Sequence, residues 1–115
     1  MSNALFSAWN RVVPGREKDA MELFQSTMAY WGKLQAAGEI DSFDPVLLAA
    51  HGGDMNGYFL IKGNPQKLDA IRHSDDFVTL QIRAGHILQG YGTVDAYHGD
   101  RLQQLMGQWG ALISG

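Results

Sequence analysis

The feature that most constrains the fold of this chain is an N-terminal strand-like segment that runs directly into a long amphipathic segment. Residues 4–13 alternate in polarity and contain Phe6 and Trp9, which is typical of a β-strand. A Pro-Gly pair at positions 14–15 ends this strand. Residues 17–37 then place apolar side chains at steps of three and four, which predicts one buried helix face: Ala20, Leu23, Phe24, Met28, Trp31 and Leu34.

The middle of the chain predicts a hairpin followed by a broken helical region. Residues 43–51 and 58–62 are strand-like, and a Gly- and Asn-rich loop separates them. Asn64 before a proline predicts a helix start, and Ser74 predicts a second one. The helical region is therefore expected to break near His73.

The last third of the chain predicts a fourth strand and a final helix. Residues 89–98 alternate, with Tyr91, Thr93, Asp95 and Tyr97 on one side. Residues 100–113 carry an apolar helical stripe: Leu102, Leu105, Met106, Trp109, Leu112 and Ile113. Because Arg101 alone supplies positive charge there, this stripe predicts packing on a core or an interface rather than on a membrane.

The order β-α-β-β-α-β predicts an α+β, ferredoxin-like domain over residues 1–115, with one antiparallel sheet, helices on one face and a C-terminal helix. The uncovered sheet face is expected to carry Trp9, Tyr58 or Phe59, Tyr91 and Tyr97, depending on the register. A large exposed apolar face usually marks a partner surface. We therefore expect a homodimer that forms through the sheet.

The composition restricts the class of partner. The formal net charge is −3, which gives no reason to expect nucleic acid binding. The absence of cysteine excludes disulfides, thiolate metal sites and cysteine nucleophiles. Neither a signal peptide nor a stretch of ~20 apolar residues is recognisable, so we expect a cytoplasmic protein without a membrane partner.

Two short motifs resemble the dimeric α+β barrel superfamily, and within it the branch of the antibiotic-biosynthesis monooxygenases. Residues 8–16, Ala-Trp-Asn-Arg-Val-Val-Pro-Gly-Arg, are similar to the family's Asn-Arg end of strand one, which precedes a Gly turn and a helix. Residues 74–77, Ser-Asp-Asp-Phe, are similar to the turn in its second helical region. The resemblance implies a dimeric barrel and a monooxygenase-like activity without a cofactor.

The same branch includes haem-degrading enzymes, in which a strand-one Asn contacts the substrate side of the haem. Asn10 matches that position. The family's Trp and its haem-ligating His, however, correspond to Ile71 and Gln81 here. This departure makes haem binding the weaker alternative, and we expect no cofactor.

The candidate catalytic residues are Asn10 and His86. Asn10 could hold a substrate oxygen, or it could end a strand and bond a neighbouring backbone group. His86 could act as a general base, or it could stabilise a helix C-terminus. The expected substrate-binding residues are Trp9, Phe77, Gln81 and Tyr91.

Other polar residues predict structure rather than chemistry. His51, His73, His86 and His98 show no metal-motif spacing, so no metal site is expected. Asp95 and Arg11 are a candidate ion pair, within one chain or between two.

Two classes of function remain open from the sequence. The first is a small-molecule binder or monooxygenase-like enzyme that acts on a hydrophobic compound, with aromatic compounds as candidates. The second is a non-catalytic dimeric module with a stress-related or ligand-sensing role. A closed pocket with converging polar groups would favour the first class.

Overall fold

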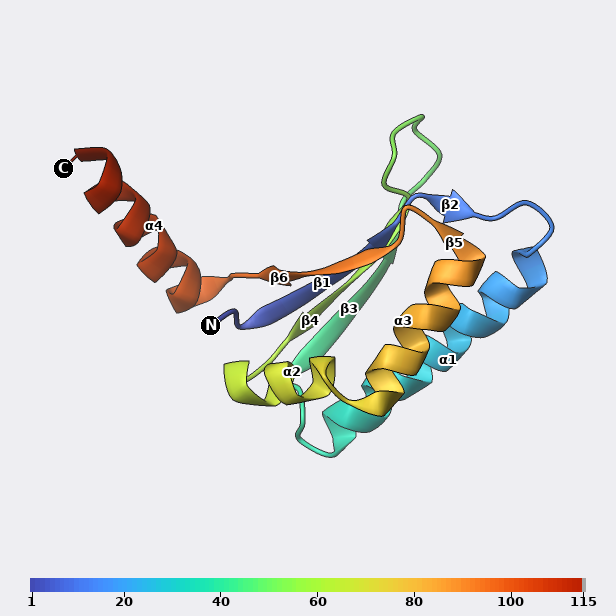
Figure 1. Cartoon of the computed structure of the whole chain (residues 1–115), viewed down its shortest axis with the longest axis horizontal. Helices are drawn as coiled ribbons and strands as arrows, with labels where there is room; N and C mark the ends of the chain where they lie inside the picture. The colour runs from blue at the N-terminus through green and yellow to red at the C-terminus, as the bar shows by residue number, and fades with distance from the viewer. Residues whose placement is uncertain (115) are drawn as a thin grey trace.

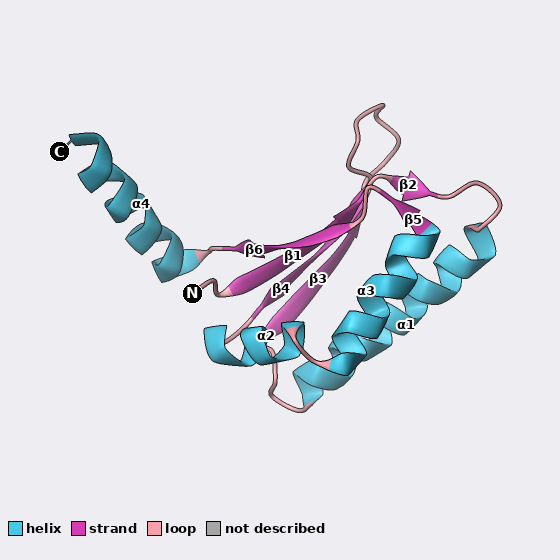
Figure 2. Cartoon of the chain, in the orientation of Figure 1, coloured by secondary structure: helices cyan, strands magenta, loops and turns pink. Residues whose placement is uncertain are grey.

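Three helices cover one face of a four-stranded antiparallel sheet in the computed structural model, which describes residues 1–114 (Figures 1 and 2). The sheet order is β3-β4-β1-β6, formed by Ser42–Leu47, Gly57–Lys62, Ala4–Trp9 and Gly92–Ala96. The covering helices are α1 (Glu17–Ala36), α2 (Pro65–Arg72) and α3 (Asp75–Ile87). This arrangement confirms the predicted α+β, ferredoxin-like fold.

Two predicted strands are each interrupted in the structure. The first bends at Asn10, where the chain leaves the main sheet and continues as β2 (Arg11–Val12), paired with β5 (Leu88–Gln89). The last is interrupted at Gly90, whose φ of +63° is a left-handed conformation that glycine adopts readily. The second predicted strand also ends early, because residues 48–56 form a loop.

The predicted helix boundaries are confirmed where they depend on local capping. The Oδ1 of Asn64 accepts hydrogen bonds from the backbone N–H of Gln66 and of Lys67, at 3.0 and 3.1 Å. The Oγ of Ser74 accepts one from the N–H of Phe77 at 3.3 Å. The helical region therefore breaks around His73, as its sequence indicates.

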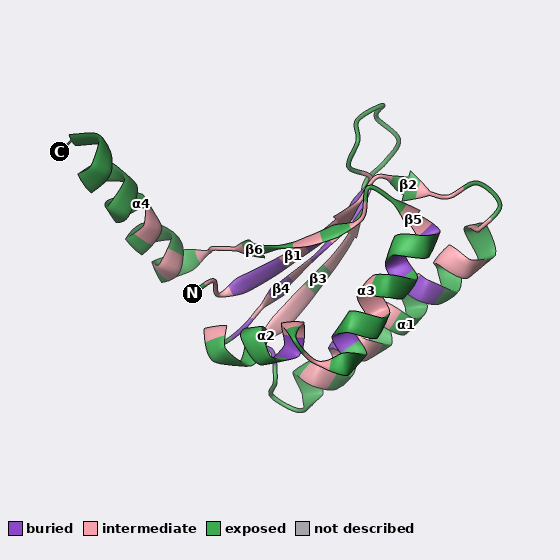
Figure 3. Ribbon diagram, in the orientation of Figure 1, coloured by how far each residue is buried: buried purple, intermediate pink, exposed green. Residues whose placement is uncertain are grey.

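The main core lies between the sheet and the helices, as the buried segments of Figure 3 show. Its fully buried side chains are those of Trp31, Leu5, Ile61 and Leu68. Because side chains alternate along a strand, Leu5, Ser7 and Trp9 of β1 face the helices. Phe6 and Ala8 lie on the opposite face.

The structure corrects the predicted composition of the uncovered sheet face. Trp9 and Tyr91 lie on the helix side, where Trp9 packs against Phe24 and Phe59. We call the uncovered side the open face and define it by five apolar side chains: Phe6, Val46, Tyr58, Leu60 and Val94. The pairing of Phe6 with both Leu60 and Val94 places these three side chains in one row across β4, β1 and β6. On the edge strand β3 the row ends at Asp44, which pairs with Leu60.

The C-terminal helix α4 (Gly99–Ser114) stands away from the rest of the molecule (Figure 1). It follows β6 closely and begins beside the N-terminal segment. Across residues 1–114, no helix combines the length and the apolar character that crossing a membrane requires.

Candidate ligand-binding cavity

A cavity of about 340 Å³ lies between the sheet and the helices α1 and α3. Ligand pockets in proteins typically measure roughly 300 to 1,000 Å³, so this cavity can hold a small molecule. Met21 and Leu47, which are 67% and 66% exposed, lie where the cavity reaches the surface. Most of the lining is apolar, including Val12, Ala20, Leu23, Phe24, Trp31, Phe59, Leu80, Ala84 and Leu88.

Aromatic rings form one wall of the cavity. The ring centroids of Trp9 and Phe59 are 6.0 Å apart, and those of Phe24 and Phe59 are 5.4 Å apart. The rings of Trp31 and Phe77 meet edge to face at 6.0 Å. Aromatic rings prefer tilted and edge-to-face contacts, so a flat apolar ligand would find complementary surfaces here.

A chain of hydrogen bonds crosses from α3 to the sheet beside the cavity. The hydroxyl of Tyr91 donates to Oε1 of Gln81, and Nε2 of Gln81 donates to Oγ1 of Thr93 at 2.9 Å. Oγ1 of Thr93 and Oγ of Ser7 are 2.7 Å apart. Tyr91 and Ser7, the two ends of this chain, both line the cavity.

The direction of these bonds determines what the cavity offers to a ligand. Oγ1 of Thr93 accepts a hydrogen bond from Nε2 of Gln81. Either hydroxyl of the Ser7–Thr93 pair can be the donor, and in one of the two arrangements Thr93 donates to Ser7. Ser7 then retains its own hydroxyl proton for another acceptor. Because Ser7 is only 5% exposed, a ligand oxygen in the cavity is the natural acceptor.

The structure brings together the four predicted substrate-binding residues but not the two predicted catalytic ones. Trp9, Phe77 and Tyr91 line the cavity, and Gln81 holds the hydroxyl of Tyr91. Their role in binding stays a prediction.

Asn10 lies outside the cavity lining, at the bend between β1 and β2. Its backbone N–H donates to the carbonyl of Gln89 at 2.9 Å. The side-chain Nδ2 of Asn56 donates to the backbone carbonyl of Asn10 at 2.5 Å and to its Oδ1 at 3.2 Å. These contacts favour the structural interpretation of Asn10, in which it fixes the end of a strand.

His86 lies in the last turn of α3, where its side chain is exposed. Among residues 1–114, no histidine lines the cavity, and no group of three His, Asp or Glu side chains could hold a metal ion. His51 and His73 instead contact nearby backbone carbonyls, those of Met55 and Asp69, each at 2.8 Å.

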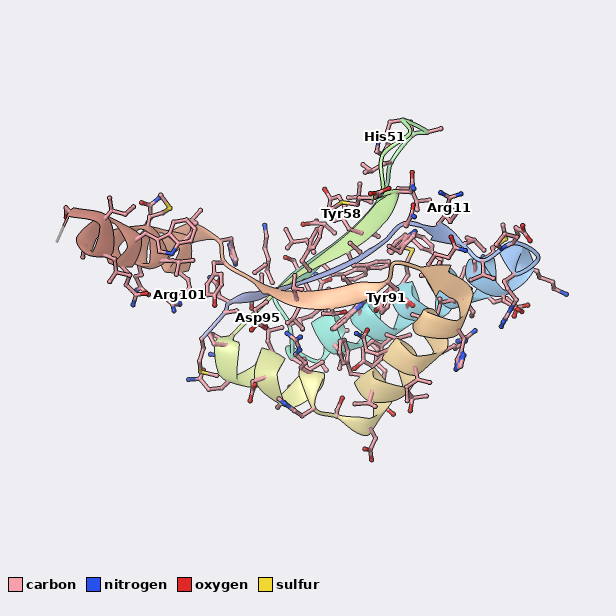
Figure 4. All side chains as sticks on the ribbon, turned by 45° about the horizontal axis from the view of Figure 1, so that its top comes forward. Arg11, His51, Tyr58, Tyr91, Asp95 and Arg101 are labelled. Carbon is pink, nitrogen blue, oxygen red and sulfur yellow. The ribbon has the colours of Figure 1, made fainter. Side chains whose placement is uncertain are left out.

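Within one chain, Asp95 pairs with Arg72 rather than with Arg11. Nη1 of Arg72 is 2.6 Å from Oδ1 of Asp95, while Arg11 lies at the far end of the sheet (Figure 4). Arg72 also donates through Nη2 to the backbone carbonyl of Thr93 at 3.0 Å. This pair joins α2 to β6 and so supports the strand that carries the hydrogen-bonded chain.

Sequence reasoning missed Ser7 as a site residue, and it assigned the strand side that carries Tyr91 and Thr93 to the uncovered face of the sheet. A signal for Ser7 was present, since it is a polar residue between Leu5 and Trp9 on an otherwise apolar strand face. The contact between Thr93 and Gln81 has no such signal, because it depends on how α3 lies against β6.

Comparisons with known proteins agree with this fold. No family model matches the chain, and no curated protein matches it. A dimeric protein of unknown function with a ferredoxin-like fold from Bacteroides fragilis is 15% identical, with a TM-score of 0.58 over 83% of this chain and 95% of that protein.

Two further solved structures are similar in fold. The protein PA3566 from Pseudomonas aeruginosa is 13% identical, with a TM-score of 0.59 over 86% of this chain and 96% of that protein. HapK from Hahella chejuensis is also 13% identical, with a TM-score of 0.53 over 84% of this chain and 94% of that protein. The chain thus shares a ferredoxin-like fold with these structures.

Proposed function

We propose that this protein binds a small, mostly apolar compound in the cavity between the sheet and the helices, with a flat aromatic compound as the preferred ligand. The observation that carries the proposal is the combination of an aromatic-walled cavity with a buried hydroxyl at Ser7 that can donate into it. Cavities that bind ligands typically join a large apolar lining to a few converging polar groups.

The hydrogen-bonded chain further specifies the polar part of the ligand. The hydroxyl of Ser7 can donate to a carbonyl or hydroxyl oxygen of the ligand. The oxygen of Tyr91, whose proton goes to Gln81, can accept from a ligand hydroxyl. An aromatic ketone or phenol is therefore the class of compound that the cavity fits best.

The geometry favours binding over monooxygenase-like oxidation of such a compound. The two residues that the sequence suggested for catalysis, Asn10 and His86, lie outside the cavity lining. Among residues 1–114, Glu17 is the one carboxylate in the lining, and it is exposed at the start of α1. No general base thus reaches the buried end of the cavity, where Ser7 lies.

Haem does not fit this site in the manner that the sequence resemblance implies. Gln81 stands where haem-degrading relatives carry the ligating histidine. Both polar groups of its amide are already engaged, one by Tyr91 and the other by Thr93. An iron ligand at this position would have to break the hydrogen-bonded chain.

We also propose that the chain self-associates through its open face. The similar protein from Bacteroides fragilis is described as dimeric, which supports self-association here. The open face itself offers Val94, 57% exposed, beside the partly exposed ring of Phe6. Apolar faces of this kind commonly form two-fold interfaces between identical chains.

Filling the cavity tests the binding proposal. Ala84 is 2% exposed and lines the cavity from α3, so Ala84→Phe should occupy the space that a ligand needs. Val78 lies on the same helix and is 43% exposed, so Val78→Phe is the matched control. Calorimetric titration with 2-acetylnaphthalene should show saturable binding to the natural chain and to the control, but not to Ala84→Phe.

A second filling variant guards against misfolding of the first. Ala20 lines the cavity from α1 and is only partly buried, so Ala20→Phe narrows the same space with less disturbance of the core. Equal affinity in the natural chain and in both filled variants would refute the cavity as the binding site.

A further inference from the structure

The helix α4 leaves its apolar stripe exposed to solvent. Within Gly99–Ser114 no side chain is buried. Along the stripe, Trp109 is 55%, Leu112 80% and Ile113 85% exposed. Figure 3 shows this helix in the colours of exposed and intermediate residues along its whole length. The stripe therefore lacks the packing that an amphipathic helix normally obtains from its own domain.

A helix of this composition is poorly stable without a surface to pack against. It has 16 residues, and isolated helices of about this length are marginal in water. Its interior contains Gly107 and Gly110, each of which disfavours the helix by about 1 kcal/mol relative to alanine. Some partner must supply the missing contacts.

The junction between β6 and α4 is fixed by contacts with the N-terminal segment. Nδ2 of Asn3 donates to the backbone carbonyl of His98 at 3.0 Å, and the N–H of His98 donates back to Oδ1 of Asn3 at 3.1 Å. Nε of Arg101 donates to the backbone carbonyl of Met1 at 2.7 Å. These bonds direct α4 away from its own sheet (Figure 4).

The open face is an apolar surface on which the stripe of α4 can pack. Its central row joins Leu60, Phe6 and Val94, and the ring of Tyr58 lies 5.1 Å from that of Phe6. Among the described residues, no helix covers this face (Figure 2). The strands β1 and β4 are six residues long, or about 20 Å, and α4 is about 24 Å long, so the two surfaces match in size.

We propose that α4 of one copy packs its apolar stripe on the open face of a second copy, and that the second copy returns the same contact. This inference rests on the proposed self-association and names the element that completes it. Each chain supplies one stripe and one open face, so a reciprocal contact closes with two-fold symmetry and leaves neither surface unpaired. Residues 102–114 contain no charged side chain, as contact with the apolar row around Phe6 requires.

A membrane is a less suitable occupant for the stripe. Helices that lie on membranes usually carry several Lys or Arg residues on their polar face. Here Arg101 is the single basic residue of α4, and it is already bonded to Met1. After Arg101, the side of α4 opposite the stripe is formed mainly by glutamine and glycine residues.

Matched charge substitutions on α4 test the proposal. Trp109→Glu lies on the stripe, and Ala111→Glu lies on the opposite side of the same helix. In light scattering and sedimentation measurements, Trp109→Glu should raise the dimer dissociation constant at least ~30-fold, as loss of a central interface residue does. Ala111→Glu should leave it unchanged.

A substitution on the open face separates this inference from the self-association on which it rests. Val94→Glu should weaken the dimer as Trp109→Glu does, while Val78→Glu on α3 should not. A dimer that Val94→Glu disrupts and Trp109→Glu leaves intact would overturn the exchange of α4 but not self-association. A natural chain that is monomeric at all concentrations would refute both.

Crosslinking identifies the surface that α4 contacts. Because the chain has no cysteine, Met106→Cys provides a unique attachment point for a benzophenone photocrosslinker. When labelled chains are mixed with ¹⁵N-enriched chains, crosslinks should join α4 to peptides of β1, β4 or β6 from the other isotopic copy. Crosslinks within one copy, or co-sedimentation with vesicles of anionic phospholipid in place of dimerisation, would overturn the proposal.

Discussion

Removal of the hydroxyl of Ser7 should weaken binding of a ligand that carries an oxygen and spare one that does not. In the proposed complex the Ser7 hydroxyl donates to the carbonyl of 2-acetylnaphthalene. A neutral hydrogen bond contributes about 0.5–1.5 kcal/mol, so Ser7→Ala should raise the Kd roughly 2- to 12-fold. For 2-isopropenylnaphthalene, which has nearly the same shape without the oxygen, the Kd should stay the same.

The same substitution should have a measurable effect on stability. Thr93 would lose the acceptor for its hydroxyl proton, since Ser7 lies 2.7 Å from it. The contact is only partly buried, so its loss should cost about 0.5–1.5 kcal/mol, which denaturant unfolding can resolve. Ser26→Ala on the exposed side of α1 is the control and should change neither quantity. Equal loss of affinity for the ketone and for its hydrocarbon analogue would refute the assigned hydrogen bond.

The remaining predictions concern two glycines and the phenol of Tyr30. Gly57→Ala would place a methyl group against the indole of Trp9, so it should destabilise the fold by about 1–3 kcal/mol and weaken ketone binding, as urea unfolding and calorimetry can show. Gly85→Ala on α3 meets no neighbour and should instead stabilise by about 0.5–1 kcal/mol; equal effects at the two sites would contradict the packing described. Burial raises the pKa of the Tyr30 phenol above its usual value of 10.0. The folded chain therefore favours the protonated phenol. The stability that this preference adds is fully present below about pH 10, and it is lost as the pH rises through the higher pKa of the folded state. In urea titrations Tyr30→Phe should lose less stability than the natural chain between about pH 9 and pH 11, and identical losses would show that Tyr30 ionises equally in both states.

The parts of the fold that depend on local sequence could be predicted from it. The period of the apolar residues identified α1, and the caps at Asn64 and Ser74 located two helix starts, because a cap bonds only to backbone a few residues away. The interruption at Gly90 was missed, since a left-handed glycine within a strand-like segment is evident only from the backbone.

The face on which each strand residue lies was harder to predict. Alternation relates Phe6 to Ala8 and Leu5 to Ser7, but it does not reveal which set faces the helices. That choice depends on long-range packing, such as the contact of Trp9 with Phe24 and Phe59. Trp9 and Tyr91 were consequently assigned to the wrong face.

In the candidate site, too, some residues could be predicted from the sequence, whereas the contacts between elements could not. The aromatic residues Trp9, Phe77 and Tyr91 could be named from the sequence, because large rings tend to gather where the core is formed. His86 falls outside the helical series of Phe77 and Ala84, so its position on the exposed side follows from the period of the helix. The chain from Tyr91 to Ser7 joins three elements, and only the tertiary structure reveals it.

The most direct test of the proposed function is to map where 2-acetylnaphthalene binds by ¹⁵N–¹H correlation spectroscopy of the natural chain. The account predicts saturable shifts confined to the residues around the cavity, on β1, β2, α1, β4, α3, β5 and the start of β6, with those of the open-face residues unchanged. Shifts confined to the open face, or no shifts at saturating ligand, would contradict it.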